Sequence, residues 1–178
     1  MLIAKELRKT NIAEYILYMW QIEDLLRACK FDDTTIEQQL VSRFKAQGEQ
    51  QAEIAAWYKN LSIMMEKEQV QEKGHIQVLI NLVNDLNEFH LKLIETGIDP
   101  EYLQLYRINT GAIAELAENS QVNNDVLVCL NALYGYMLLK LKSIEISPET
   151  HSSIENFARL VGYLSARYIQ FENDDFEF

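Results

Sequence analysis

The chain has 178 residues, of which 48% are hydrophobic and 24% charged, with only 2 prolines and 6 glycines. This balance is typical of a globular protein, and it argues against a disordered chain and against a loop-rich β-sandwich. The formal net charge of −11 argues against nucleic acid and anionic membranes as partners. Such binding needs clustered basic side chains, and the only tight basic group is Lys5, Arg8 and Lys9.

Targeting signals are not evident. The N-terminal sequence MLIAKELRKTN is charged from Lys5 onward and lacks the apolar core of a signal peptide. The longest apolar run, residues 126–139, is shorter than the roughly 20 residues that span a bilayer. Cys29 and Cys129 both lie in predicted helices. Two buried free thiols are the simplest interpretation and indicate a reducing compartment; one disulfide between them is the alternative, which nothing in the sequence favours. We therefore predict a cytoplasmic protein with no membrane segment.

Helices are predicted along the whole chain from capping residues and apolar periodicity. Asn11 and Glu14 form a capping box at the first start, and Asp99-Pro100 and Ser147-Pro148 mark two later starts. No segment alternates with a period of two, so no strand is predicted. The predicted helices are residues 11–29, 34–47, 49–73, 75–96, 100–119, 124–143 and 148–171.

Short connections predict antiparallel neighbours. The fold class is therefore all-α, a single-domain antiparallel bundle of about seven helices over residues 1–171. Residues 172–178 form an acidic, aromatic tail that is expected to be flexible, and docking of this tail into a groove on a partner or a second copy is the alternative. Gly111, Gly135 and Gly162 lie inside predicted helices at a cost in stability. Close helix approach is the expected reason, and a gap left open for a ligand is the alternative.

The first helix, residues 11–29, is apolar nearly all the way round, yet Glu23 falls on its apolar side. A buried carboxylate is costly unless it is paired. In one interpretation Glu23 lines a pocket with Tyr15 and Trp20, where burial raises its pKa and lets it act as a base or bind a cation. In the other it forms a structural ion pair with Arg27, four residues on. Asp24 points beside that pair.

Further polar residues fall on apolar helix faces. His75 and His90 share one face of the helix at 75–96, but about 22 Å along the axis separates them, so they cannot share a metal ion within one chain. Each is most simply a structural histidine with one partner. Asn131 and Tyr134 lie in the apolar run at 126–139, where a buried amide must find a hydrogen bond, either across to another helix or in a cavity.

No complete catalytic motif is present. The one Glu-x-x-His string, Glu72 to His75, crosses a predicted helix break, so a di-iron site is poorly supported. Glu115 and Glu118 resemble half of the acidic motif of helical nucleotide pyrophosphohydrolases, and the other half is missing. Neither a cofactor nor a metal ion is predicted, and catalytic residues stay unassigned. The candidate ligand-binding residues are Tyr15, Trp20, Glu23, Asp24, Arg27, His75, His90, Asn131 and Tyr134.

Three strings carry a family resemblance: NIAEYILYMWQIEDLLRA at residues 11–28, EKGHIQ at 72–77 and ALYGYMLLKLKSIEISPET at 132–150. They resemble a bacterial family of all-helical proteins that is catalogued as a domain of unknown function. The resemblance covers nearly the whole chain. It implies a small bacterial intracellular protein with one helical domain, and it assigns no activity and no site residue.

Two hypotheses for the function remain. The first is a non-enzymatic binding or self-association module, whose partner is a second copy or another protein. The alternative is a helical pocket protein or enzyme that binds a small cationic or polar ligand, with or without a metal ion, through buried carboxylates on the first helix. Under the alternative, Glu23→Gln abolishes ligand binding and leaves thermal stability nearly unchanged.

Overall fold

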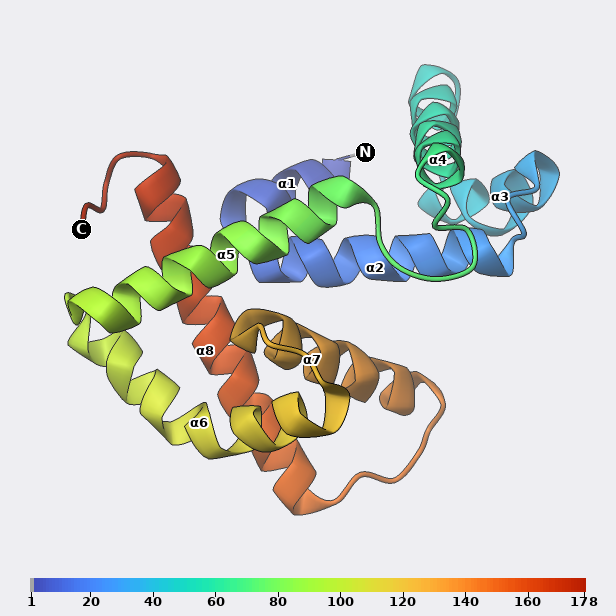
Figure 1. Cartoon of the computed structure of the whole chain (residues 1–178). Helices are drawn as coiled ribbons and strands as arrows, with labels where there is room; N and C mark the ends of the chain where they lie inside the picture. The colour runs from blue at the N-terminus through green and yellow to red at the C-terminus, as the bar shows by residue number, and fades with distance from the viewer. Residues whose placement is uncertain (1) are drawn as a thin grey trace. The chain divides into compact units, whose positions relative to one another are not determined.

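The computed structural model describes residues 2–178 and is helical throughout (Figure 1). Within these residues there are eight α-helices, one short 3₁₀ helix and no strand, which confirms the all-α prediction. The elements are α1 (Leu2–Thr10), α2 (Ile12–Ala28), α3 (Asp33–Gln39), η1 (Val41–Phe44), α4 (Glu49–Lys67), α5 (Gln77–Thr96), α6 (Pro100–Ser120), α7 (Asp125–Leu141) and α8 (Pro148–Glu172).

The chain divides into two compact units. The N-terminal unit comprises residues 1–8 and 15–80, and the C-terminal unit comprises residues 9–14 and 81–178. The single domain over residues 1–171, the flexible tail at 172–178 and the antiparallel bundle stay predictions.

Local capping sets the starts of four helices. The side chains of Asn11, Asp99, Asn124 and Ser147 each accept a hydrogen bond from the backbone N–H three residues on, at 2.7 to 3.2 Å. A capping side chain satisfies one of the N–H groups that the first turn of a helix leaves unpaired. The predicted starts of α2, α6, α7 and α8 are therefore confirmed to within one residue.

One helix is not predicted. Helix α1 covers Leu2–Thr10 and ends where Asn11 begins to cap α2. Its sequence LIAKELRKT is rich in Leu, Ala, Lys, Glu and Arg, which are strong helix formers. An isolated helix of this length is only marginally stable in water. Ala4 of α1 is buried, and this packing helps to stabilise the helix.

The predicted helices at 34–47 and 49–73 are too long. Helix α3 begins earlier, because Asp32 accepts hydrogen bonds from both the amide and the hydroxyl of Thr35, and it ends at Gln39. Helix α4 ends at Lys67, where Gln69 takes a left-handed conformation with φ of 59° and the amide of Val70 bonds back to the carbonyl of Met65 at 3.0 Å. Residues 68–76 are consequently a connection, and α5 begins at Gln77 rather than at His75.

The core of the C-terminal unit lies where α8 packs against α6 and α7 (Figure 1). Along α8 the buried apolar residues follow a spacing of three and four, which places them in one stripe. This stripe comprises Ile154, Phe157, Leu160, Val161 and Leu164. The three helices also surround the pocket described below.

The helices of residues 2–178 can be compared with what crossing a membrane requires. None of the helices in this range combines the length and the apolarity that crossing a bilayer requires.

Candidate functional site

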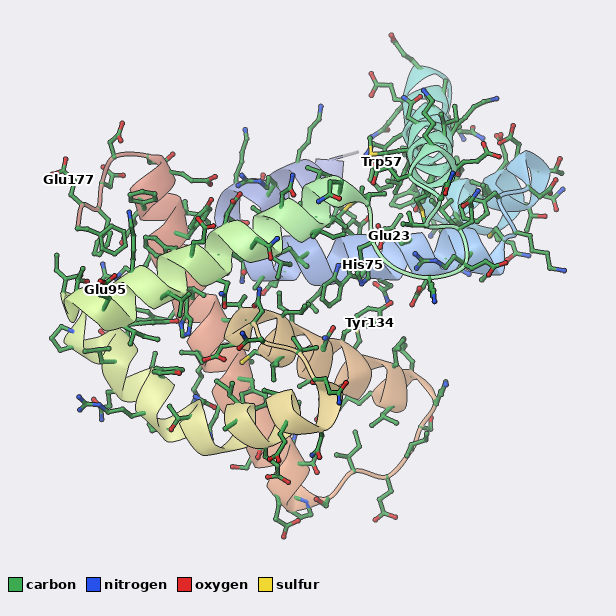
Figure 2. The ribbon with its side chains drawn as sticks, viewed as in Figure 1. Glu23, Trp57, His75, Glu95, Tyr134 and Glu177 are labelled. Atoms are coloured by element: carbon green, nitrogen blue, oxygen red, sulfur yellow. The ribbon has the colours of Figure 1, made fainter. Side chains whose placement is uncertain are left out.

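Glu23 is completely buried in the N-terminal unit, as predicted. Its Oε1 accepts a hydrogen bond from the backbone amide of Ile76 at 3.0 Å, and its Oε2 lies 2.5 Å from Nδ1 of His75. The His75 ring stacks on Trp20, with 4.3 Å between the ring centroids and an interplanar angle of 16°. Figure 2 shows Glu23 and His75 side by side. Both carboxylate oxygens therefore already have partners within the protein.

This arrangement lets a side chain of α2 hold the start of α5. Ile76 immediately precedes Gln77, the first residue of α5, and amide groups at a helix start lack partners within the helix. Glu23 supplies such a partner from a position 53 residues away in the sequence. The carboxylate also lies near the N-terminal, positive end of the α5 dipole.

Arg27 does not pair with Glu23, so the predicted ion pair between them is wrong. Its guanidinium bonds to Asp24 at 2.7 Å and to the backbone carbonyl of Val70 at 3.0 Å, and it also donates to the carbonyl of Gly74. The carbonyls of Val70 and Gly74 belong to the connection 68–76, which passes beside Arg27. The partner of Glu23 is instead His75, from the same connection. We call Trp20, Glu23, Asp24, Arg27 and His75 the Glu23 cluster.

The other four candidates lie elsewhere. Tyr15 is half-buried in the N-terminal unit, and burial raises the pKa of its hydroxyl, with Arg8 acting in the opposite direction. His90, Asn131 and Tyr134 belong to the C-terminal unit. Tyr134 is half-buried there, and Asn131 is exposed. The expectation of a buried amide at Asn131 is therefore wrong.

His90 is a core histidine with polar partners. Only 1% of its surface is exposed, and its Nδ1 is hydrogen-bonded to the hydroxyl of Tyr102. Its Nε2 lies 3.5 Å from the Asp125 carboxylate, to which the Tyr106 hydroxyl donates at 2.9 Å. Burial, together with Asp125, raises the pKa of the neighbouring Cys129 thiol to about 12. The space these residues enclose leaves no room for a water-sized group, so we interpret this network as structural.

Asp125 makes the C-terminal unit sensitive to acid. The hydrogen bond from His90 lowers the pKa of this carboxyl, against the opposing effect of burial, and the hydroxyl of Tyr106 lowers it further. The folded protein thus keeps Asp125 charged at pH values where the unfolded chain protonates it. The associated stability is present above the ordinary pKa of about 3.9 and is lost as pH falls through the lowered value.

We expect Asp125→Asn to remove part of this acid sensitivity. Between about pH 5 and pH 2, the range that brackets an ordinary carboxyl pKa, the wild type should lose more unfolding free energy than the variant. Urea unfolding at a series of pH values measures the difference. Equal losses of unfolding free energy in the two proteins would show that protonation of Asp125 does not contribute to the pH dependence of stability.

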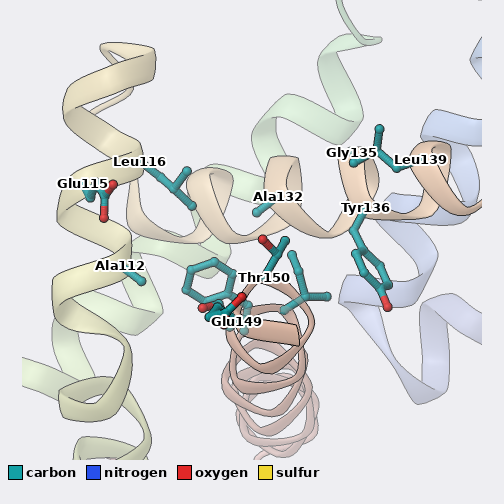
Figure 3. A pocket seen from close by; sticks show the side chains of 12 residues that line it. Ala112, Glu115, Leu116, Ala132, Gly135, Tyr136, Leu139, Glu149 and Thr150 are labelled. Carbon is teal, nitrogen blue, oxygen red and sulfur yellow. The ribbon is translucent and has the colours of Figure 1, made fainter. Parts of the chain in front are cut away.

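A pocket of about 570 Å³ opens on the C-terminal unit between α6, α7 and α8 (Figure 3). Its volume lies within the range of small-molecule binding pockets. Apolar side chains make up most of the wall, and the first turns of α8 contribute Glu149, Thr150 and Ser153 to it. The lining residues are Ala112, Glu115, Leu116, Ala132, Gly135, Tyr136, Leu139, Glu149, Thr150, Ser153, Ile154 and Phe157.

Gly135 opens onto this pocket from the middle of α7. A Cβ built on Gly135 meets no atom within 4 Å, and the same holds for Gly111 and Gly162. The expectation that close helix approach explains these three helical glycines is therefore wrong. At Gly135 the alternative, a gap left open beside a cavity, fits the geometry, because this glycine lines the pocket.

A chain of polar side chains runs along one edge of the pocket. The Tyr136 hydroxyl lies 2.6 Å from Nδ1 of His151, and Nε2 of His151 lies 3.5 Å from the Glu155 carboxylate. The ammonium of Lys140 lies 5.0 Å from the centroid of the Tyr136 ring. None of these residues is among the candidates predicted from the sequence. The small residues Ala132 and Gly135, three apart on α7, are the local signal that could have indicated a hollow there.

Metal binding finds no support in residues 2–178. Within this part of the chain no three or more His, Cys, Asp or Glu side chains gather where they could share an ion. The Glu23 cluster contributes one carboxylate and one imidazole in direct contact, and Asp24 pairs with Arg27 instead.

Residues 1–175 match the model of a family described as Domain of unknown function (DUF4924), and the chain belongs to this family. No curated protein and no solved structure matches this chain. The family resemblance read from the three sequence strings is confirmed, and the family description assigns no activity.

Proposed function

We propose that this family member is a non-enzymatic binding module that takes an apolar group of its partner into the pocket between α6, α7 and α8. The space above Gly135 carries the proposal. Glycine in a helix interior costs about 1 kcal/mol relative to alanine, and here no neighbouring atom prevents a larger side chain. A bound group of the partner that fills the apolar hollow beside Gly135 would explain why the helix has glycine at this position.

The surroundings of the pocket support the same role. Leu116 and Leu139 line it and remain 37% and 38% exposed, so a bound apolar group would cover surface that now faces water. Glu115 and Glu149 lie on the lining from two different helices. Hydrogen bonds from its own amide and from Ser147 lower the pKa of Glu149, which favours its charged form. The pocket therefore joins an apolar wall to an acidic rim.

The alternative, ligand binding through carboxylates on α2, has less support. Both oxygens of Glu23 are already engaged by His75 and Ile76, so a ligand would have to displace these partners at the cost of two hydrogen bonds to a buried charge. Free, buried Cys29 and Cys129 support the cytoplasm as the place where the module acts.

Filling the pocket tests the proposal. We expect the neutral apolar dye N-phenyl-1-naphthylamine to bind with enhanced fluorescence, and Gly135→Leu to weaken that binding about ten-fold, since a Leu side chain occupies the space and tenfold corresponds to about 1.4 kcal/mol. The same substitution should raise the melting temperature, because leucine is the better helix former.

Gly111→Leu is the matched control. Gly111 is also helical and unobstructed, but it does not line the pocket. Gly111→Leu should raise the melting temperature by a similar amount and leave dye binding unchanged. Absence of dye binding to the wild type at low protein concentration, or equal binding by both variants, would refute the proposed function.

A further inference from the structure

We propose that the end of α8 and the part of α5 beside it form a docking surface for a Phe-x-Phe segment of a partner protein, and that the chain's own C-terminal tail occupies this surface until the partner displaces it. The inference goes beyond the proposed function, because the pocket lies at the first turns of α8 and this surface at its last turns. We call it the tail surface, and its residues are Phe89, Lys92, Arg167, Tyr168 and Phe171.

Two rings of the tail complete the aromatic surroundings of Phe89, a side chain of α5 that is only 3% exposed. The ring centroids of Tyr168 and Phe171, both on α8, lie 5.4 and 5.3 Å from that of Phe89. Those of Phe176 and Phe178 lie 6.0 and 5.2 Å from it, and Figure 1 shows the chain turning back after α8 toward α5. Aromatic pairs at these separations attract each other, so the two tail rings bind to Phe89 and shield it from water.

Each tail ring also lies beside a cation of the tail surface. The ammonium of Lys92 lies 5.0 Å from the ring centroid of Phe178, and the guanidinium of Arg167 lies 5.5 Å from that of Phe176. Both separations are within the range of a cation–π interaction. Glu177, between the two rings, is exposed. A segment with two phenylalanines separated by one residue therefore matches the surface, with one ring for each cation and the middle residue in water.

Side chains alone hold the last three residues of the tail. The amides of Asp174 and Asp175 still bond back to the last turn of α8, and Asp174 takes a left-handed conformation with φ of 60° that turns the chain. Beyond this turn, no hydrogen bond joins residues 176–178 to the rest of the described chain. Phe178 stays 39% exposed although it is docked. A segment held in this way can be exchanged for another of the same chemistry while α8 stays folded.

The tethered tail competes with every incoming segment. A short flexible linker gives a tethered group an effective concentration in the millimolar range. A free peptide should therefore bind the wild-type chain weakly, whereas a partner that adds contacts outside the tail surface can displace the tail. Removing both rings of the tail removes the competitor and leaves the surface open to a peptide.

Peptide binding provides the first test. The probe is a fluorescein-labelled synthetic peptide with the sequence of residues 173–178, Asn-Asp-Asp-Phe-Glu-Phe. We expect fluorescence anisotropy to show that it binds the full-length Phe176→Ser/Phe178→Ser chain at least about ten-fold more tightly than the wild type, because the wild-type tail competes at millimolar effective concentration. A peptide with serine in place of both phenylalanines should bind neither chain. Circular dichroism confirms that the variant is folded.

Two lysines provide matched controls in the Phe176→Ser/Phe178→Ser chain. Lys92→Ala should weaken peptide binding about three-fold, the effect expected for a cation–π interaction at an exposed site. Lys140 also lies 5.0 Å from a ring centroid, that of Tyr136, but on α7, so Lys140→Ala should leave binding unchanged. Gly135→Leu, which fills the pocket, should also leave it unchanged, so this inference and the proposed function can fail independently.

Displacement of the tail provides the second test. In a full-length chain with para-fluorophenylalanine at position 178, the fluorine resonance should differ from that of the free peptide carrying the same label. It should move toward the free-peptide position as excess unlabelled peptide is added. A resonance that matches the free peptide from the start, or one that stays in place while the peptide binds, would overturn the inference.

The binding measurements can overturn it as well. Three results would do so: no peptide binding by the folded Phe176→Ser/Phe178→Ser chain, binding of equal strength by this chain and the wild type, or equal effects of Lys92→Ala and Lys140→Ala. The first would show that the tail surface has no affinity for a Phe-x-Phe segment. The second would show that the tail does not occupy the surface, and the third that the peptide binds elsewhere.

Discussion

Glu23→Ala lowers the free energy of unfolding by about 3 kcal/mol, as expected when a buried, hydrogen-bonded carboxylate is removed and its buried partners are left unpaired. The carboxylate is fully buried and bonds to the amide of Ile76 and to His75. Alanine leaves that amide without its partner and opens a cavity beside His75, whose ring stacks on Trp20. Urea unfolding measures the loss.

Two comparisons sharpen this prediction. Glu23→Gln keeps an acceptor for the Ile76 amide and should cost about 1 kcal/mol, the scale of a single neutral hydrogen bond. Asp24→Ala breaks a partly exposed pair with Arg27 and should cost under about 1 kcal/mol. Hydrogen exchange at the Ile76 amide should quicken in the alanine variant. A Glu23→Ala protein as stable as the wild type would refute the structural role and return Glu23 to the ligand-binding hypothesis.

Asp99→Ala is the second substitution with a large expected effect, a loss of about 2 to 4 kcal/mol. Asp99 is 4% exposed and caps α6 through the amide of Tyr102 at 3.0 Å. Its carboxylate also accepts from the Tyr163 hydroxyl at 3.1 Å and from Nε of Arg167 at 2.7 Å, both on α8. One carboxylate therefore joins the turn between α5 and α6 to the far end of α8.

Asp99→Asn separates the contribution of the helix cap from that of the charge beside Arg167. Asparagine keeps the cap but loses the charge that faces Arg167, so we expect about half of the alanine effect. Glu101→Ala is the control, since its exposed carboxylate lies 3.3 Å from the same Tyr163 hydroxyl and should matter by less than about 0.5 kcal/mol. Thermal and urea unfolding measure all three variants. Equal effects of Asp99→Ala and Glu101→Ala would contradict the account.

Helix starts proved readable from the sequence, and some helix ends did not. Asn11, Asp99, Asn124 and Ser147 act on amides three residues away, so their effect is contained in the local string. Helix α4 should run to Lys73 by its composition, but it ends at Lys67 because the chain turns at Gln69 into the connection that meets Arg27. That turn is favoured by contacts with α2, which no local pattern reveals.

In the candidate site, too, the sequence predicted the local feature and did not predict the contacts between distant segments. Apolar periodicity predicted that Glu23 is buried, and it is. It predicted the wrong partner, since Arg27 is the nearest basic group along the helix, whereas His75 arrives from 52 residues away. The pocket on the C-terminal unit was not predicted, because three helices supply its walls and none of them alone shows a hollow.

The sequence by itself determined the helical class, the capped starts of four helices and the burial of Glu23, since each depends on residues within a turn or two of one another. Only the tertiary structure decided the partners of Glu23, the hub at Asp99 and the space above Gly135. Each of these depends on side chains brought together from distant segments. Such contacts form only where helices pack, and helix packing follows shape and volume across the whole unit rather than any local spacing.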